Sequence, residues 1–122
     1  MKITQSKVGF EKYYQSIFGN EPKLIPEFVY LIHNDDLVIG FVSGHKNFDG
    51  LFYIEHAGIL PDFQKLGYVR YLKSAFDHIG GGFVTAVNNE NKETIRILVA
   101  ADFKIVGFKT ICEKSYIEFM RQ

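Results

Sequence analysis

The middle of the sequence constrains the fold most, because it places a helix between two strands. Leu51 to Leu60 is rich in β-branched and aromatic residues and predicts a strand. Tyr68 to Ile79 carries an apolar stripe with helical spacing, and Phe83 to Val87 predicts a second, shorter strand. A strand–helix–strand unit of this kind crosses over right-handed, which makes the two strands parallel. The unit therefore predicts a sheet with a parallel pair and a helix packed on it.

The flanking segments add helices and antiparallel strands. Two runs rich in Val, Ile, Phe and Tyr surround the polar turn Asn34-Asp35-Asp36 and predict a hairpin. The elements predicted outside the central unit are a helix over Lys7 to Phe18, strands over Glu27 to His33 and Leu37 to Ser43, a helix over Lys92 to Ala101, and a hairpin of Lys104 to Ile111 with Ser115 to Arg121. We expect an α/β (α+β) fold, with a mixed, mostly antiparallel central sheet and flanking helices, in one domain over residues 1–122.

Charge and composition exclude several functional classes. The 122 residues contain 14 Lys plus Arg and 14 Asp plus Glu, so the net charge is zero. This balance argues against nucleic acid or a membrane surface as the main partner. The single cysteine, Cys112, excludes a disulfide framework, and the four scattered histidines lack metal-ligand spacing. We therefore expect no metal site. No apolar run is long enough to span a membrane, and no secretory leader is recognisable, so we expect a cytoplasmic protein.

One stretch between a predicted strand and a predicted helix has the properties of an anion site. Gly67 allows a ligand to approach the backbone closely, and Lys65 and Arg70 add positive charge. The first turn of the helix that follows presents unpaired N–H groups and the positive end of the helix dipole. A pyrophosphate fits this pattern better than a neutral ligand does. The alternative interpretation of the same spacing is a solvated turn between strand and helix.

The same stretch resembles a known family. Pro61-x-x-Gln64-x-x-Gly67-x-Val69 resembles the Gln/Arg-x-x-Gly-x-Gly/Ala loop of the GNAT superfamily of acyl-CoA N-acyltransferases. Downstream, Asn91-x-x-Thr94-x-x-x-Leu98-x-x-x-Asp102-Phe103 resembles the family segment Asn-x-x-Ala/Ser-x-x-x-Tyr-x-x-x-Gly-Phe. The resemblance covers about Glu27 to Arg121. It implies a GNAT-like fold whose N-terminal region is shortened and lacks one of the family's first elements.

The resemblance also implies a cosubstrate and the residues that hold it. The cosubstrate is acetyl-CoA or another acyl-CoA, and no metal is implied. Its pyrophosphate would lie on the loop, largely on backbone N–H groups, while Asn91 would reach toward the pantetheine arm and backbone groups near Ile59 would polarise the thioester carbonyl. The complete predicted binding set is Ile59, Gln64, Lys65, Leu66, Gly67, Tyr68, Val69, Arg70 and Asn91.

The implied reaction moves an acetyl group to a primary amine of a small molecule or a protein. The amine must lose a proton, and in the family a carboxylate near the position of Glu55 often accepts it, so Glu55 is the predicted catalytic base. His56 is its neighbour on the same predicted strand. Adjacent strand residues face opposite sides of a sheet, so we expect only one of the two to point into a cleft.

Three departures from the family pattern leave other functions open. Val69 stands where Gly or Ala is usual, Asp102 replaces a Gly, and Leu98 stands where many members carry a Tyr that protonates the leaving thiolate. Tyr68 or Tyr71 could replace that Tyr only if the geometry allows it. The alternatives are a catalytically inactive GNAT-like fold that serves as a structural or protein-interaction protein, and an acyl-CoA sensor.

Two further expectations concern partners. The segment from Val87 to Phe103 also resembles the GNAT-like portion of an internal virion protein of podophages, which is the basis for a structural alternative in a phage particle. The C-terminal strands, which are often exposed in this fold, make a homodimer an expectation as well.

Overall fold

The sheet and helices are built from nearly the whole chain. The computed structural model describes residues 2–47, 49–65 and 67–122, and these residues form one seven-stranded sheet and four helices. The strands are β1 (Lys2–Gln5), β2 (Phe28–Asn34), β3 (Leu37–Lys46), β4 (Phe52–Ile59), β5 (Phe83–Asn88), β6 (Lys104–Ile111) and β7 (Lys114–Arg121). The helices are α1 (Phe10–Phe18), α2 (Pro61–Gln64), α3 (Tyr68–Ile79) and α4 (Lys92–Ala100). In the sheet the strand order is β1-β2-β3-β4-β5-β7-β6.

The predicted fold class is confirmed. β4 and β5 are parallel and flank the crossover through α3, whereas the other neighbouring strands are antiparallel. Two elements were not predicted: the single turn α2, and β1, a four-residue strand of mostly polar residues that pairs with the edge of β2. α1 begins at Phe10, later than predicted, because Gly9 adopts a φ of 80° and starts the helix there. An N-terminal strand is therefore present, which corrects the predicted element order.

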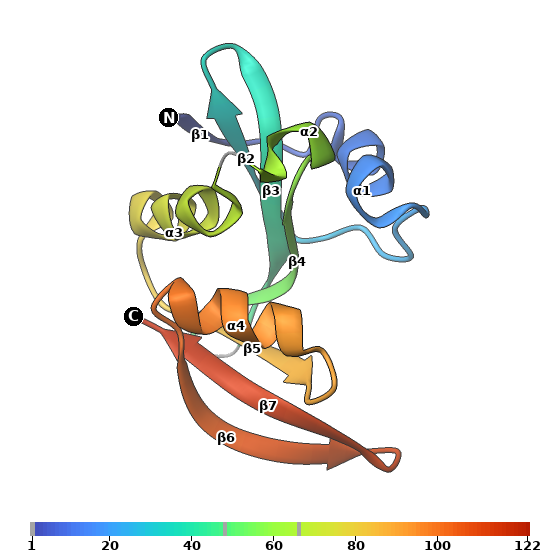
Figure 1. Cartoon of the computed structure of the whole chain (residues 1–122), viewed down its shortest axis with the longest axis vertical. Helices are drawn as coiled ribbons and strands as arrows, with labels where there is room; N and C mark the ends of the chain where they lie inside the picture. The colour runs from blue at the N-terminus through green and yellow to red at the C-terminus, as the bar shows by residue number, and fades with distance from the viewer. Residues whose placement is uncertain (1, 48, 66) are drawn as a thin grey trace.

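Helices cover both faces of the sheet (Figure 1). One face packs on α3 and α4, and its core includes Phe76 of α3, Leu98 of α4 and Phe83 of β5. The other face carries a smaller aromatic core in which Phe10 and Tyr14 of α1 pack on β2 and β3. α1 thus packs on one face of the sheet, while the crossover helix α3 and α4 pack on the other. The central strands must therefore be apolar on both sides.

An extra residue in β4 breaks the regular alternation of its side chains. Ser43 is opposite His56, but the next residue of β3, Gly44, is opposite Ile54, so Glu55 is the additional residue of a β-bulge. Gly44 makes this bulge feasible, because a Cβ atom at this position would collide with the backbone carbonyl oxygen of Tyr53.

The bulge coincides with the separation of β4 from β5. Within the described residues, the two strands pair only at Phe52 with Phe83 and Tyr53 with Val84, while β5 and β7 pair along the full length of β5. Thr85 Oγ1 donates a 2.9 Å hydrogen bond to the Ile54 carbonyl oxygen where the strands begin to diverge. Figure 1 shows β5 and β7 turning away from the direction of β4 beyond this point. The sheet therefore opens between its two parallel strands.

Arg121 ties the two helices beside this opening to the last strand. Its buried guanidinium donates from Nε to the Ala101 carbonyl oxygen at 3.0 Å and pairs with Asp77. The same group lies 5.8 Å from the ring centre of Phe76. The end of α4 and the end of α3 are thereby held against β7, and the positions of both helices relative to the opening are fixed.

Gly44→Ala tests the close contact at the bulge. We expect the free energy of unfolding to fall by about 2 kcal/mol or more, because the added methyl group forces β3 away from β4 at a fully paired position. Urea unfolding measures the change. Ser115→Ala, at an exposed site on β7, should stay within about 0.5 kcal/mol of the wild type. A Gly44→Ala protein as stable as the Ser115→Ala control would contradict the proposed role of Gly44.

Candidate functional site

A cavity of about 300 Å³ occupies the opening between β4 and β5. Its walls come from both strands, from α3 and from α4, and they are mostly apolar. Leu72 of α3 and Leu98 of α4 face it from the helices, and Ala57 and Val87 face it from the strands. A cavity with these walls suits a narrow, uncharged chain, because it offers apolar contact along its length.

A second cavity of about 590 Å³ continues the first toward the N-terminus of α3. The two cavities share five lining residues from α1, α3 and α4: Phe18, Tyr68, Asn91, Thr94 and Ile97. The outer cavity also carries charge, since Lys65 and Arg96 line it with Glu93. The two cavities therefore form one groove that is apolar inside and carries a net positive charge outside.

The structure brings most of the predicted binding residues to this groove. Those that line it are Gln64, Lys65, Tyr68, Val69 and Asn91. Ile59 is fully buried in the core, and Arg70 is exposed with its guanidinium 5.5 Å from the ring centre of Tyr71. Leu66, which was also predicted, lies outside the described residues.

Backbone geometry at the outer end of the groove is of a kind that favours an anion. Gly67 has a φ of 121°, a conformation that L side chains rarely adopt, and it starts α3. The first helical hydrogen bond of α3 runs from the Tyr71 N–H to the Gly67 carbonyl oxygen, so the N–H groups of Tyr68 and Val69 belong to the first turn. These donors and the helix dipole favour an anion at the outer end of the groove.

Two of the predicted side chains also hold the groove together. Gln64 Nε2 donates a 2.9 Å hydrogen bond to the Ile59 carbonyl oxygen and ties the loop to the end of β4. Asn91 Oδ1 accepts a 3.3 Å hydrogen bond from the Thr94 N–H and caps α4. Both residues therefore shape the groove walls as well as lining them.

Glu55 and His56 lie together, which the sequence did not predict. Both line a third pocket of about 400 Å³ beneath α1, and both also line the inner cavity of the groove. The expectation that only one of them could point into a cleft is wrong. It assumed an unbroken alternation of side chains, and the bulge at Glu55 places two successive side chains on the same face. The groove and the pocket meet at these two residues.

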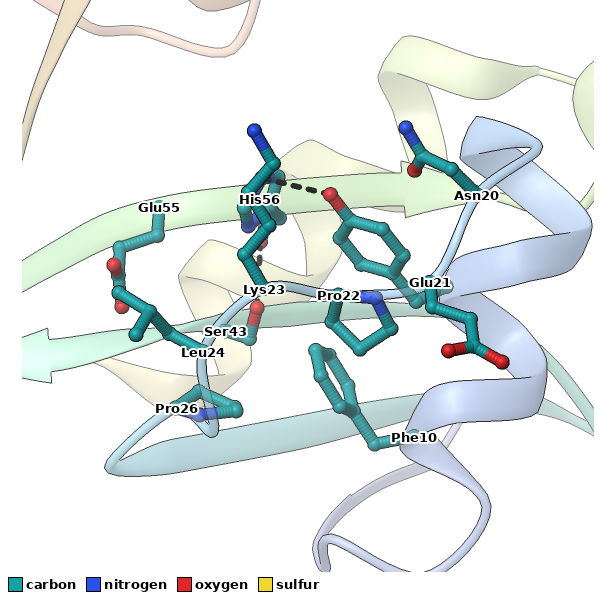
Figure 2. Close-up of a pocket in the computed structure, with 11 residues that line it drawn as sticks. Phe10, Asn20, Glu21, Pro22, Lys23, Leu24, Pro26, Ser43, Glu55 and His56 are labelled. Atoms are coloured by element: carbon teal, nitrogen blue, oxygen red, sulfur yellow. Dashed lines mark hydrogen bonds between the residues drawn. The ribbon is translucent and has the colours of Figure 1, made fainter.

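Figure 2 shows the pocket beneath α1. Its apolar lining comes from Phe10 and Tyr14 of α1 and from the prolines of the segment that joins α1 to β2. Ser43 lies at its base and donates a 3.3 Å hydrogen bond from Oγ to the His56 carbonyl oxygen. The Oε1 atom of Glu55 lies 3.5 Å from the Nδ1 atom of His45. The pocket is thus part apolar and part acidic.

His56 is held by aromatic contacts with α1. Its Nε2 atom and the Tyr14 hydroxyl form a 3.3 Å hydrogen bond, and its ring lies 4.9 Å from the ring of Tyr14 and 5.4 Å from that of Phe18. Burial lowers the pKa of His56 below its ordinary value of 6.5, and the Glu55 carboxylate partly opposes this shift. At neutral pH His56 is therefore uncharged and able to accept a proton.

A tyrosine does line the groove close to Leu98. Leu98 is buried and supplies no hydroxyl, while Tyr68 lines both cavities of the groove. Burial, with a smaller contribution from Glu93, raises the pKa of Tyr68 above 10.0. Tyr68 therefore keeps its proton at neutral pH. Tyr71, the other sequence candidate, is not among the described lining residues of either cavity.

The sequence did not single out two contributors to the site. Tyr14 lies on the apolar stripe of the helix predicted over Lys7 to Phe18 and is buried, as a core residue would be, but its hydroxyl contacts His56. Arg96 lies in the Val87 to Phe103 segment but was not predicted as a binding residue, and only the tertiary structure places it at the outer cavity. A tyrosine on an apolar helical stripe is a weak signal for a site, because the same pattern is typical of a core.

The described residues show neither a metal-binding cluster nor a membrane-spanning helix. Across residues 2–47, 49–65 and 67–122, no group of three or more His, Cys, Asp and Glu side chains is arranged to hold a metal ion. Among the helices formed by the described residues, none has the length and apolar character needed to cross a membrane.

Substitution of His56 should change how stability depends on pH. Because the folded chain has the lower His56 pKa, the unfolded chain binds the proton more readily, and the free energy of unfolding rises with pH in the window below 6.5. Above pH 6.5 His56 is mostly uncharged in both the folded and the unfolded chain, so its contribution to the free energy of unfolding no longer increases with pH. Thermal unfolding of His56→Gln between about pH 5 and pH 7.5 should therefore show a smaller change in Tm than the wild type shows. His78→Gln, at an exposed site on α3, is the matched control, and equal slopes in wild type and His56→Gln would contradict the assignment.

Comparison with known proteins identifies the fold. No protein-family model matches the sequence, and no curated protein matches it. Among solved structures, an acetyltransferase of the GNAT family from Bacillus cereus ATCC 10987 superposes with a TM-score of 0.70 at 14% identity, over 99% of this chain and 96% of that one. The ribosomal-protein-S18-alanine N-acetyltransferase of Escherichia coli superposes with a TM-score of 0.64 at 11% identity, over 98% and 92%.

A third similar structure contains the cosubstrate. It is a candidate streptothricin acetyltransferase from Bacillus anthracis strain Ames in complex with acetyl coenzyme A, with a TM-score of 0.60 and 18% identity. The alignment covers 88% of this chain and 66% of that one, just under two thirds of its length. At these identities the comparison establishes architecture: the chain has the fold of the GNAT acetyltransferases.

Proposed function

We propose that the protein is an acetyl-CoA-dependent N-acetyltransferase that acts on a primary amine. The observation that carries this proposal is that the groove and the pocket beneath α1 meet at Glu55 and His56. A transfer reaction needs two sites that share one boundary, since donor and acceptor must touch at the reacting atoms. Two of the similar structures support the class: one is in complex with acetyl-CoA and the other is an alanine N-acetyltransferase for a ribosomal protein.

The groove accounts for the binding of the cosubstrate. The pyrophosphate would lie on the first turn of α3, between the backbone N–H groups of Tyr68 and Val69 and the cations Lys65 and Arg96. The pantetheine arm, which is narrow and uncharged, would follow the apolar inner cavity between β4 and β5. This order brings the thioester to the end of the groove that Glu55 and His56 line.

The chemistry needs proton acceptors and a proton donor. The Glu55 carboxylate would take a proton from the bound ammonium, directly or through water. His56, which is uncharged, lies beside it as a second acceptor. The amine nitrogen then attacks the thioester carbonyl carbon, and the carbon–sulfur bond breaks as Tyr68 would donate its hydroxyl proton to the leaving sulfur. The second proton that the nitrogen loses would pass to His56, and the Tyr68 phenolate would regain a proton from solvent. The elevated pKa of Tyr68 suits this role, because the phenol must be protonated before transfer.

A sensor that binds acyl-CoA without turnover is the second candidate. The observation that favours it is Leu98, a buried apolar side chain at the position of the usual acid. A sensor needs the groove but neither Glu55 nor Tyr68. Binding and turnover measurements therefore separate the two functions.

Acetyl-CoA should stabilise the protein, and Val69→Ala should strengthen this effect. A ligand at about 100 times its Kd adds about 2.7 kcal/mol to the free energy of unfolding, which is a shift of several degrees in Tm. Val69 lines the outer cavity, and removal of its branched methyl groups gives the pyrophosphate more room. Val99→Ala, at an exposed position on α4, is the matched control. ATP serves as a phosphate control. An equal rise in Tm with ATP and with acetyl-CoA would contradict a coenzyme groove, and so would the absence of any rise with acetyl-CoA.

Glu55→Gln and Tyr68→Phe should each lower kcat by about 10²–10⁴-fold, because each removes one general acid–base group. Both variants should still be stabilised by acetyl-CoA, since neither change removes a charge from the pyrophosphate end of the groove. Thiol release during turnover measures kcat, and Tyr71→Phe is the matched control for Tyr68→Phe. Retention of acetyl-CoA binding with no turnover in the wild type would instead support the sensor.

A further inference from the structure

The pocket beneath α1 has a composition that limits which amine it can take. This inference deepens the proposed function and, in naming the pocket as the acceptor site, rests on it. The pocket holds about 400 Å³ and is formed by α1, β3, β4 and the segment that joins α1 to β2. That volume accommodates a small molecule of a few bonds in length rather than a folded protein surface.

The middle of the pocket is apolar. Phe10 and Tyr14 are 7% and 8% exposed, and their rings form the α1 side of the lining. Pro22 and Pro26 complete the apolar surface from the joining segment, and Pro26 is itself buried. Figure 2 shows Phe10 and Pro22 between the two acidic residues of the pocket. An aliphatic chain fits this surface, and a cation gains from the aromatic faces.

The acidic residues lie at opposite ends. Figure 2 shows Glu55 at one end of the pocket, on β4, and Glu21 at the other end, where the chain leaves α1. Glu55 lines both this pocket and the groove. Glu21 lines this pocket but neither of the two cavities of the groove. One carboxylate therefore faces the proposed acetyl donor, and the second is remote from it.

The charge balance of the pocket favours a cation. Its other ionisable groups are Lys23, which also lines it, and His56, which burial keeps uncharged at neutral pH. His45 lies outside the lining and contacts Glu55 at 3.5 Å from a half-exposed position. Two carboxylates against one ammonium give the lining a net negative charge. An anionic acceptor is thus disfavoured, and a molecule with one amino group would use only one of the two acidic ends.

We propose that the acetyl acceptor is a small aliphatic diamine. One ammonium lies at Glu55, where it loses its proton and is acetylated, and the other stays charged at Glu21 and positions the chain. The hydrocarbon spacer packs on Phe10, Tyr14 and Pro22. Glu21 is therefore a specificity-determining residue that does not touch the reacting atoms.

Calorimetric titration without acetyl-CoA tests the pocket by itself. The probes are 1,5-diaminopentane and 1-aminopentane, which share the spacer and differ in one amino group. Because Glu21 is exposed, we expect the diamine to bind on the order of fivefold more tightly at most, the upper range for an exposed ion pair. Glu21→Gln should abolish this preference and leave the affinity for the monoamine unchanged. Glu11→Gln, an exposed carboxylate on α1 outside this pocket, should keep the preference.

The outcomes separate this inference from the proposed function. Equal affinity for both amines, or a preference that survives in Glu21→Gln, overturns the diamine assignment even if acetyl-CoA binds. Diamine binding that depends on Glu21 in a protein that does not bind acetyl-CoA supports the pocket and overturns the transferase. If both bind, steady-state kinetics should show Glu21→Gln raising KM for the diamine with little change in kcat, as a positioning role requires.

Discussion

The bulge at Glu55 is the feature on which the rest of the site depends. It lies where the pairing of β4 with β5 ends, directly beside the space that forms the inner cavity. Gly44 is the residue opposite that permits the bulge, because a side chain there would collide with the Tyr53 carbonyl oxygen. One extra residue in β4 and one missing side chain in β3 thus turn Glu55 and His56 to the same face, at the point where the sheet opens.

Two residues of the groove have structural tasks as well as lining it. Gln64 fastens its loop to the end of β4, and Asn91 caps α4, yet both line the cavity. A side chain already fixed by a hydrogen bond loses little further freedom when a ligand binds. This arrangement gives a short chain a preformed groove without additional elements. Arg121 contributes from a distance, because it fixes the ends of α3 and α4 against β7.

The sequence predicted what depends on local pattern. Apart from the single turn α2, the helices follow from apolar periodicity, and so do most strands. The parallel pair follows from the crossover, and the loop before α3 follows from Gly67 and its neighbours. The strand β1 was missed because its four residues are mostly polar and gain their structure only by pairing with β2.

What the sequence could not predict depends on register. A bulge leaves no mark in composition, so the shared face of Glu55 and His56 was out of reach. The pocket beneath α1 was also out of reach, since it joins residues as distant as Phe10 and Glu55. Likewise, the choice between Tyr68 and Tyr71 required knowing which face of α3 meets the groove.

The most direct test of the account is to map where coenzyme A binds, residue by residue. In a titration followed by amide chemical shifts, we predict the largest changes at residues 67–69, around the start of α3, and at residues 54–57 and 85–88, on the two sides of the sheet opening. The turn between β6 and β7 should not respond. Changes centred on that turn, or changes at the first turn of α3 without any at the β4–β5 opening, would contradict the claim that coenzyme A lies in the groove between β4 and β5.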